Sequence, residues 1–559
     1  MDLSRAITLA DSDELIDTET TFKLCAGPGA GKTRFLINHI NNVIKNSKRL
    51  TTTKKIACIT YTNIGVETII DRLDNAINEV EVSTIHSFLY KHVIKPYLWV
   101  LDKNIPLADV KGHDEIIPRV SILKTWTKET HQYYLTDYGA LQRELKDLRW
   151  LLQPDGKIEL KRKYFNLQIR NDSLIKYKEL CWGNALISHD DILFLSYEIL
   201  KKEKRILEVL RAKFPYIFID EFQDTSPIQS EIIKMIGEKE TIIGVIGDVG
   251  QSIFAFQGAK VEKFIEFNLN NCQSYKIENN YRSTEEIIDV LNHVRNESDF
   301  LQKSPDNKKG NFPQILIGRY FDSYKESINI SRDEHICTLS YKNDIANIMK
   351  WGYEDYFNSE DINEPLFRDG NRGWLITFTI TAIEYSFQNK IKDALKYMEK
   401  AYRKIENFDE KKALENLKRL RDNYNNYKDG SIREFYNNYI YGNYGVQQRI
   451  TRGPTSDYYE SREYKKIAVT VRINDDDSLH RTIHKSKGDQ FKSVLLIIPP
   501  EENLEFLLNP DITREKNRLY YVALSRAKKN LFINISQLSE DKITQIKGIG
   551  FDVVKLDNN

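Results

Sequence analysis

The sequence predicts an α/β fold built on parallel sheets, and two observations support this prediction. Short apolar runs alternate with helical segments along much of the chain, an order typical of parallel sheets with helices on their faces. In addition, an apolar run at residues 21–25 leads through a glycine-rich octapeptide into a helical pattern from Arg34 to Ile44. The further strand candidates are Lys55–Thr60, Tyr216–Asp220, Thr241–Gly247, His335–Ser340, Ser493–Ile498 and Leu531–Ile535.

Composition excludes several classes of protein. A chain of 559 residues is too long for one core, and 41% hydrophobic with 29% charged residues is typical of a soluble globular protein. We find no apolar run near the roughly 20 residues of a membrane span and no signal-peptide layout at the N-terminus. Five scattered cysteines exclude the usual zinc or iron–sulfur spacings and indicate a reducing cytoplasm.

Two stretches interrupt the α/β alternation and define the expected domains. Residues 89–183 and 351–474 are rich in Lys, Glu, Tyr and Asn with helical periodicity, so we expect mainly helical insertions there. They divide a first α/β core (1–88 and 184–280) from a second core (281–350 and 475–559). Only 23 residues follow Ser536, so we expect no C-terminal nuclease or accessory domain.

Charge gives weaker information about partners. The net charge of +1 does not by itself indicate nucleic-acid binding. Between Arg143 and Arg170, eight Lys or Arg residues stand against four Asp or Glu residues. This segment fits a solvated surface at least as well as a phosphate-contacting patch.

The octapeptide predicts a phosphate-binding P-loop. Strand, glycine loop and helix in this order let backbone N–H groups surround phosphate oxygens at a helix N-terminus. Lys32 would reach the β- and γ-phosphates, and the Thr33 hydroxyl would bind Mg²⁺. Ala26 stands where the first glycine of the usual pattern is expected. The loop consists of Ala26, Gly27, Pro28, Gly29, Ala30, Gly31, Lys32 and Thr33.

An acidic pair follows a later apolar strand. Asp220 and Glu221 come directly after Tyr216–Ile219, which places both carboxylates at the edge of the sheet where α/β proteins bind ligands. Asp220 would hold Mg²⁺ through water, and Glu221 would act as the general base for an attacking water. Such a pair is weak evidence alone, and the P-loop upstream strengthens it.

These motifs resemble those of the UvrD/PcrA/Rep family of superfamily 1A DNA helicases. Asp220–Thr225 resembles the second helicase motif. The other motifs of the family occur along the chain in the family's order. They are Ile59–Asn63 (motif Ia), Ser83–Phe88 (Ib), Ile246–Ala259 (III), Asn280–Ser283 (IV), Thr482–Phe491 (V) and Asn517–Ala527 (VI). The resemblance implies two RecA-like P-loop NTPase cores, each with a mainly helical insertion.

The resemblance also implies roles at the nucleotide. Arg282 and Arg526 occupy arginine-finger positions, and Gln251 would sense the γ-phosphate and couple it to DNA. The adenine would lie between the Tyr281 ring and the Arg34 side chain. In motif V, Gly488 and Gln490 join the residues expected to bind the nucleotide.

DNA contacts are implied in the same way. Aromatic rings can stack on bases of any sequence, as a motor requires. By family position, Tyr61, Phe254 and Phe256 would stack on bases. The strand backbone would be contacted by Thr60, Asn63, His86, Thr482 and His484.

Four departures from the family pattern leave nucleotide preference and DNA coupling open. The family carries a glutamine upstream of the P-loop that reads adenine, whereas the first glutamine here is Gln132. Use of GTP, another NTP or a dNTP is therefore an alternative to ATP. Gln257 replaces a motif III arginine, Gln490 replaces a motif V glutamate, and Ile85 replaces a motif Ib aromatic.

The leading hypothesis is an ATP- and Mg²⁺-dependent 3′→5′ translocase and helicase on single-stranded or tailed duplex DNA, in repair or anti-phage defence. The alternative is a DNA-end-sensing regulatory NTPase that assists a separate nuclease subunit with little unwinding. The compact size resembles the helicase subunit of the Gabija defence system. A P-loop small-molecule kinase would leave the two arginine motifs and the DNA-facing motifs without a purpose.

Overall fold

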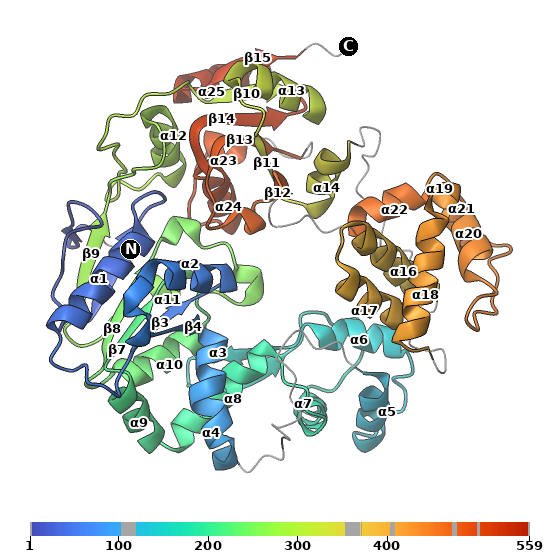
Figure 1. Cartoon of the computed structure of the whole chain (residues 1–559), viewed down its shortest axis with the longest axis horizontal. Helices are drawn as coiled ribbons and strands as arrows, with labels where there is room; N and C mark the ends of the chain where they lie inside the picture. Colours follow the sequence, from blue (N-terminus) through green and yellow to red (C-terminus); the bar gives the residue numbers. More distant parts are fainter. Residues whose placement is uncertain are drawn as a thin grey trace. The chain divides into compact units, whose positions relative to one another are not determined.

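A computed structural model describes residues 3–101, 105, 119–352, 369, 372–402, 408–471, 478–499 and 504–556. The chain forms two compact units. The first contains Met1–Asn311 and Glu505–Lys529, and the second contains Phe312–Leu504 and Asn530–Asn559. Figure 1 shows the elements of each unit.

The first unit is built on a seven-stranded parallel sheet in the order β1-β9-β2-β8-β7-β3-β4. The central strands β2, β8, β7 and β3 are buried along their whole length and mainly apolar, as expected for a sheet with helices on both faces. The strands are β1 (Ile7–Thr8), β2 (Phe22–Ala26), β3 (Ile56–Thr60), β4 (Val80–Thr84), β7 (Tyr216–Ile219), β8 (Ile242–Gly247) and β9 (Gln273–Ile277).

Helix α10 of the first unit begins at a recognisable sequence signal. In α10, Ser226 accepts from the N–H of Gln229, whose side chain returns to Ser226, and Pro227 occupies the first turn, so helix start and sequence agree. The helices around the sheet are α1 (Lys32–Asn46), α2 (Asn63–Leu73), α9 (Arg205–Lys213), α10 (Pro227–Gly237), α11 (Glu262–Ile265), α12 (Glu285–Arg295), α23 (Glu505–Leu508) and α24 (Glu515–Leu524).

The described part of the 89–183 stretch is mostly helical, and it also contains an antiparallel hairpin that the sequence analysis did not anticipate. This hairpin pairs β5 (Arg149–Leu152) with β6 (Ile158–Lys161). The helices in and beside this stretch are α3 (Ile85–Leu89), α4 (Lys95–Tyr97), α5 (Val120–Glu129), α6 (Tyr138–Lys146), α7 (Ser173–Gly183) and α8 (His189–Lys202), with a π-helix at Tyr90–Ile94.

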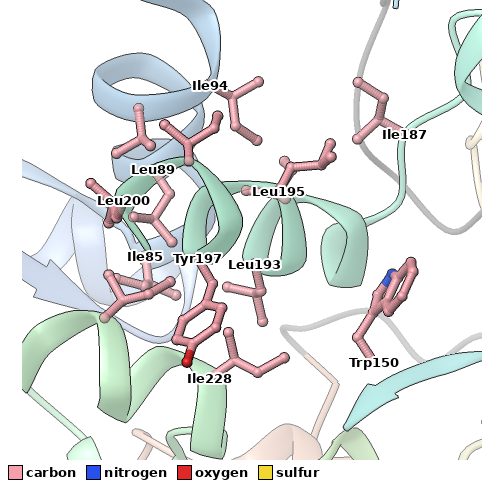
Figure 2. Close-up of a cluster of buried hydrophobic side chains, with 14 of the residues drawn as sticks. Ile85, Leu89, Ile94, Trp150, Ile187, Leu193, Leu195, Tyr197, Leu200 and Ile228 are labelled. Carbon is pink, nitrogen blue, oxygen red and sulfur yellow. The ribbon is translucent and has the colours of Figure 1, made fainter. Parts of the chain in front are cut away.

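One hydrophobic core joins the inserted stretch to the sheet unit. In Figure 2, Ile85 and Leu89 from α3 lie against Leu193 and Leu200 from α8. Trp150 of β5 belongs to the same core, which extends to apolar residues of α10 and β7. The insertion and the sheet therefore share buried apolar surface, the main stabilising term for such packing.

The second unit carries a six-stranded sheet in the order β12-β11-β13-β14-β10-β15. The strands are β10 (Gln314–Ile317), β11 (Cys337–Ser340), β12 (His480–Thr482), β13 (Phe491–Ile497), β14 (Ala527–Ile535, its first three residues in the first unit) and β15 (Asp552–Lys555). Among the described residues, α13 (Tyr320–Ser331), α14 (Asn343–Trp351) and α25 (Glu540–Ile549) accompany these strands. Two α/β cores with parallel sheets are thus confirmed.

The described part of the 351–474 stretch is helical, with a tyrosine-rich core. Tyr464 is buried there and donates from its hydroxyl to the buried carboxylate of Glu384, 3.0 Å away. The helices are α16 (Arg372–Phe387), α17 (Ile391–Ala401), α18 (Glu410–Asp422), α19 (Tyr424–Tyr427), α20 (Ile432–Phe435), α21 (Pro454–Glu460) and α22 (Tyr464–Val471), with a π-helix at Tyr436–Ile440.

The compact units do not follow the four predicted domains throughout. Residues 281–311 and 505–529, assigned from the sequence to the second core, group with the first sheet. The physical reason is local packing, because motif IV lies on the P-loop and α24 packs beside motif III. The division into four domains therefore stays a prediction. No helix in the described ranges is both long and apolar enough to cross a membrane.

Candidate nucleotide-binding site

The P-loop lies between β2 and α1, as its sequence context requires. Gly29 and Gly31 have φ angles of 76° and 83°, a left-handed conformation that glycine adopts at little cost. Gly31 is the N-cap of α1, so the first N–H groups of that helix have no acceptor within the helix and are able to bind anions.

Ala26 is the last residue of β2 and pairs in register with Ile277 of β9. It is fully buried, in extended backbone. A strand position of this kind needs no glycine, which explains why alanine is accommodated where the family pattern expects glycine.

Lys32 directs its ammonium group back over the loop. Its Nζ donates to the main-chain carbonyls of Ala26 and Gly27, at 3.2 and 3.4 Å. Thr33, next along α1, is half-buried. A cation and a hydroxyl therefore stand at the N-terminus of the helix, beside the loop N–H groups.

The acidic pair lies where β7 ends. The Asp220 N–H donates to the Ile59 carbonyl of β3 (2.8 Å), which sets the position of the pair at the edge of the sheet. Glu221 has a φ of 55°, uncommon for a non-glycine residue and typical of functional sites. Its carboxylate accepts a hydrogen bond from the Gln223 amide, so its orientation is constrained.

Motif III places Gln251 next to a buried carboxylate. The Gln251 amide nitrogen donates to Oδ2 of Asp248 at 2.7 Å, while its oxygen lies 3.4 Å from Nη2 of Arg526. The Asp248 N–H donates to the side-chain oxygen of Gln223 at 3.1 Å. Motifs II, III and VI are therefore connected by hydrogen bonds within one unit.

Two arginines lie close together in this unit. Arg282 donates from Nη1 to the Ser525 carbonyl at 2.8 Å, and Arg526 is 2% exposed. Burial, together with the nearby charge of Arg526, lowers the pKa of Arg282 to about 9, while the charge of Glu221 opposes the shift. Because burying like charges together is unfavourable, this position favours a bound anion.

Motif IV packs directly on the P-loop. The Tyr281 N–H donates to the Gly29 carbonyl at 3.1 Å, and a side chain at Gly29 would clash with the Asn280 amide. The buried Gln302 donates to the Pro28 carbonyl at 2.9 Å. The main chain of Tyr281 therefore lies on the P-loop, while the expected contact of its ring with adenine stays a prediction.

The Arg34 side chain forms an ion pair with Asp13. Its guanidinium makes a bidentate pair with Asp13, whose Oδ1 also accepts from Asn38 at 2.7 Å. Ser12, next to Asp13, packs against Gly31. The residues beside the P-loop on this side are therefore a serine and an aspartate, consistent with the missing upstream glutamine.

The aromatic residues expected to stack on bases differ in exposure. Phe256 is 57% exposed, whereas Phe254 is 9% exposed and stacks on the Tyr61 ring at 5.0 Å. The Tyr61 hydroxyl also donates to the Gln257 side chain, the residue at the motif III position where the family has arginine. Burial raises the pKa of Tyr61.

The residues of the first unit expected to contact the DNA backbone are Thr60, Asn63 and His86. Thr60 ends β3 and is buried, while Asn63 begins α2 and is exposed. His86 in α3 packs its ring edge-on against that of His189, 4.7 Å away.

The motif V residues belong to the second unit. Thr482 ends β12 and is buried, and the His484 ring lies 6.5 Å from that of Tyr341. Gly488, with a φ of 93°, and Gln490 are exposed.

Comparison with known proteins shows the family of this chain. Residues 11–271 match the UvrD/REP helicase N-terminal domain, and residues 322–538 match the UvrD-like helicase C-terminal domain. Together these two matches cover most of the chain. The chain belongs to the UvrD/Rep helicase family.

Individual UvrD/Rep relatives are distant in sequence. The ATP-dependent DNA helicase Rep of Buchnera aphidicola is 23% identical, over 91% of each chain. The ATP-dependent DNA helicase PcrA of Bacillus subtilis is 24% identical over 68% of this chain and 51% of its own length. PcrA of Leuconostoc citreum is 24% identical over 53% of this chain and 39% of its own. Several matches thus span about half the relative or less.

The donor chemistry of the site fits magnesium held largely by a substrate. No cluster of three or more His, Cys, Asp or Glu side chains suited to a metal occurs within the described ranges. Magnesium commonly uses one or two protein oxygens together with substrate phosphates. The Thr33 hydroxyl and the Asp220 carboxylate are oxygen donors of this kind.

Sequence reasoning missed the roles of four residues that build the site: Asp13, Gln223, Gln302 and Asp248, whose carboxylate accepts several hydrogen bonds. Gln223 and Asp248 lie inside recognised motifs shortly after β7 and β8, so their polar character was a usable signal. Asp13 and Gln302 lie outside any motif, and only the fold brings them to the P-loop.

Proposed function

We propose that this chain is an ATP-dependent DNA translocase and helicase that moves 3′→5′ on single-stranded DNA. The observation that carries the proposal is the pair formed by the half-buried Arg282 and the buried Arg526, in the same unit as Lys32 and Glu221. Two cations facing an acid and a P-loop match the demands of γ-phosphoryl transfer, in which charge develops on equatorial oxygens.

In this mechanism the P-loop N–H groups hold the phosphates and Lys32 neutralises the β- and γ-oxygens. Binding requires Lys32 to exchange its loop carbonyl partners for phosphate oxygens, which are stronger acceptors because they are charged. Thr33 and Asp220 would hold Mg²⁺, which neutralises phosphate charge when it is bound.

Glu221 accepts a proton from the attacking water, and the Gln223 amide keeps its carboxylate oriented. Arg282 and Arg526 stabilise the negative charge that develops on the phosphoryl group. Gln251 lies against Arg526 and so is able to pass a change at the arginine to motif III, which carries Phe254 and Phe256.

On the DNA side, Phe256 is the exposed ring and therefore the main platform for a base, with Tyr61 and Phe254 stacked behind it. We assign strand-backbone contacts to Thr60, Asn63 and His86 in the first unit and to Thr482 and His484 in the second. We likewise propose that Arg34, Tyr281, Gly488 and Gln490 contact the nucleotide.

One observation favours the second candidate function, a DNA-end-sensing NTPase that assists a partner nuclease. Two of the three rings assigned to bases are packed on each other, and Gln257 binds the Tyr61 hydroxyl. Fewer exposed rings favour weaker strand tracking. Under either candidate we propose a cytoplasmic role in DNA repair or anti-phage defence.

The deciding experiment is strand displacement with ATP and Mg²⁺ on duplexes carrying a 3′ or a 5′ single-stranded tail. The helicase proposal expects displacement from the 3′-tailed duplex and hydrolysis stimulated by single-stranded DNA. Stimulated hydrolysis without displacement from either substrate would favour the regulatory NTPase. The absence of both from the folded protein would contradict the two candidates.

A further inference from the structure

A buried arginine outside the helicase motifs contacts the centre of motif III. Arg295, the last residue of α12, is 1% exposed and donates from Nη1 to Oδ1 of Asp248 at 2.7 Å, and Asp248 is fully buried. Its Nε donates to Glu297 at 2.7 Å, and its guanidinium lies 4.0 Å from the centre of the Phe300 ring. Arg295 is therefore held on several sides.

Asp248 uses its two oxygens differently. Oδ1 accepts from Arg295 and from the Gly250 N–H at 3.0 Å. Oδ2 accepts from the Gln251 amide nitrogen. A carboxylate can only accept and a guanidinium can only donate, so Gln251 must turn its nitrogen to Asp248 and its oxygen to Arg526.

The packing around this group leaves little freedom. A side chain on Gly250 would come within 2.9 Å of the Tyr521 ring and 3.4 Å of Arg295. The Tyr521 hydroxyl itself lies 3.5 Å from Nη1 of Arg295. Arg295 thus reaches motif III and motif VI at once.

We propose that Arg295 is a positioning residue for hydrolysis: by holding Asp248, it sets the amide orientation of Gln251 that faces Arg526. The inference rests on the proposed function, since it assumes that Gln251 and Arg526 act on a γ-phosphoryl group. Without Arg295, Asp248 is a buried carboxylate lacking its cation, and it would shift or take up a proton. Either response releases Gln251.

The test is a double-mutant cycle of Arg295→Gln and Gln251→Ala, measured by steady-state ATP hydrolysis. Arg295→Gln alone should lower kcat on the order of 10²-fold, the effect of misplacing a reacting group by about 1 Å. The KM for ATP should change less than about threefold, because the P-loop is untouched. In the Gln251→Ala background, Arg295→Gln should cost nothing further in kcat.

The matched control is Arg211→Gln. Arg211 is also a buried arginine, but it donates to the main-chain carbonyls of Ile236 and Met235, outside the site. The Arg211→Gln variant should lose thermal stability, as the Arg295→Gln variant does, but its kcat should stay unchanged. If Arg295→Gln does not fold, the same cycle uses Arg295→Lys, which keeps the charge and should lower kcat only where Gln251 is present.

Unchanged kcat in the folded Arg295 variant, or an equal loss in both backgrounds, would overturn the inference while leaving the proposed function intact. A wild-type protein that binds but does not hydrolyse ATP would instead contradict the proposed function. The two failures are therefore separate results.

Discussion

Arg282 donates a hydrogen bond to the main-chain carbonyl of Ser525, the residue that precedes Arg526. This contact joins motif IV to motif VI and brings two cations into one buried region. Burial and the neighbouring Arg526 together lower the pKa of Arg282 to about 9. The repulsion between the two guanidinium groups is therefore relieved when an anion binds between them, and the predictions on hydrolysis rest on this property.

Arg282→Ala and Arg526→Ala are each expected to lower the hydrolysis rate about 10³-fold or more, as for groups that stabilise transition-state charge. The double variant should lose less than the product of the two effects if both act on one phosphoryl group. Steady-state hydrolysis of the three variants provides the measurement. Wild-type rates in either single variant would contradict the shared site.

Lys32→Ala should abolish hydrolysis and leave the fold intact. Lys32 is half-buried and bonds only to loop carbonyls in the described contacts, so its loss removes phosphate binding without opening the core. Circular dichroism and ATP binding would accompany the hydrolysis assay. Near-normal turnover in the folded variant would rule out the P-loop assignment.

Glu221→Gln should retain nucleotide affinity and slow hydrolysis by orders of magnitude, because an amide cannot accept the water proton. The glutamine is close in shape, so the contact with Gln223 and the local backbone should persist. Single-turnover hydrolysis together with equilibrium ATP binding separates the two quantities. A variant with lost affinity and an unchanged catalytic rate would place the general base elsewhere.

Phe256→Ala should reduce single-stranded DNA affinity roughly 5- to 150-fold, equivalent to about 1–3 kcal/mol for one stacked base. Basal hydrolysis should survive, and the salt dependence of binding should change little because phosphate contacts remain. Phe312, at 60% exposure against 57% for Phe256, provides the matched control. Equal losses in Phe256→Ala and Phe312→Ala would contradict the assignment.

His39 should make the protein sensitive to acid. It is buried in α1 among the rings of Phe22, Phe35 and Phe218, and neither ring nitrogen has a hydrogen-bond partner in the described part of the chain. Burial lowers its pKa to about 4. The unfolded chain then binds more protons below pH 6.5, so stability falls as the pH drops towards 4.

The expected cost at pH 5 is about 2 kcal/mol relative to neutral pH. His39→Leu should remove this contribution, so its thermal midpoint should rise relative to wild type as the pH falls from 7.5 to 5. His335, which is exposed, serves as the control through His335→Gln. A constant difference between His39→Leu and wild type at both pH values would show that His39 does not titrate as expected.

The sequence by itself determined the α/β class, the P-loop and the approximate positions of β2, β3, β7, β8, β11, β13 and β14. It did not point to the other strands, among them β4, β9 and the β5–β6 hairpin. The features that it determined are local: a buried strand needs a run of apolar residues, and a phosphate loop needs glycines at left-handed positions such as Gly29 and Gly31. The acidic pair after Tyr216–Ile219 was predictable for the same reason. Motif order then led to the family, which the N- and C-terminal domain matches bear out.

Tertiary structure alone decided which polar groups meet. Arg295 lies 47 residues from Asp248 along the chain, and Gln302 lies 274 residues from Pro28, so no local pattern specifies either contact. The same holds for Phe254 and Phe256, two residues apart in one motif, of which only Phe256 is exposed. Burial depends on what the remainder of the fold packs against a side chain, and this information is distributed over the whole sequence.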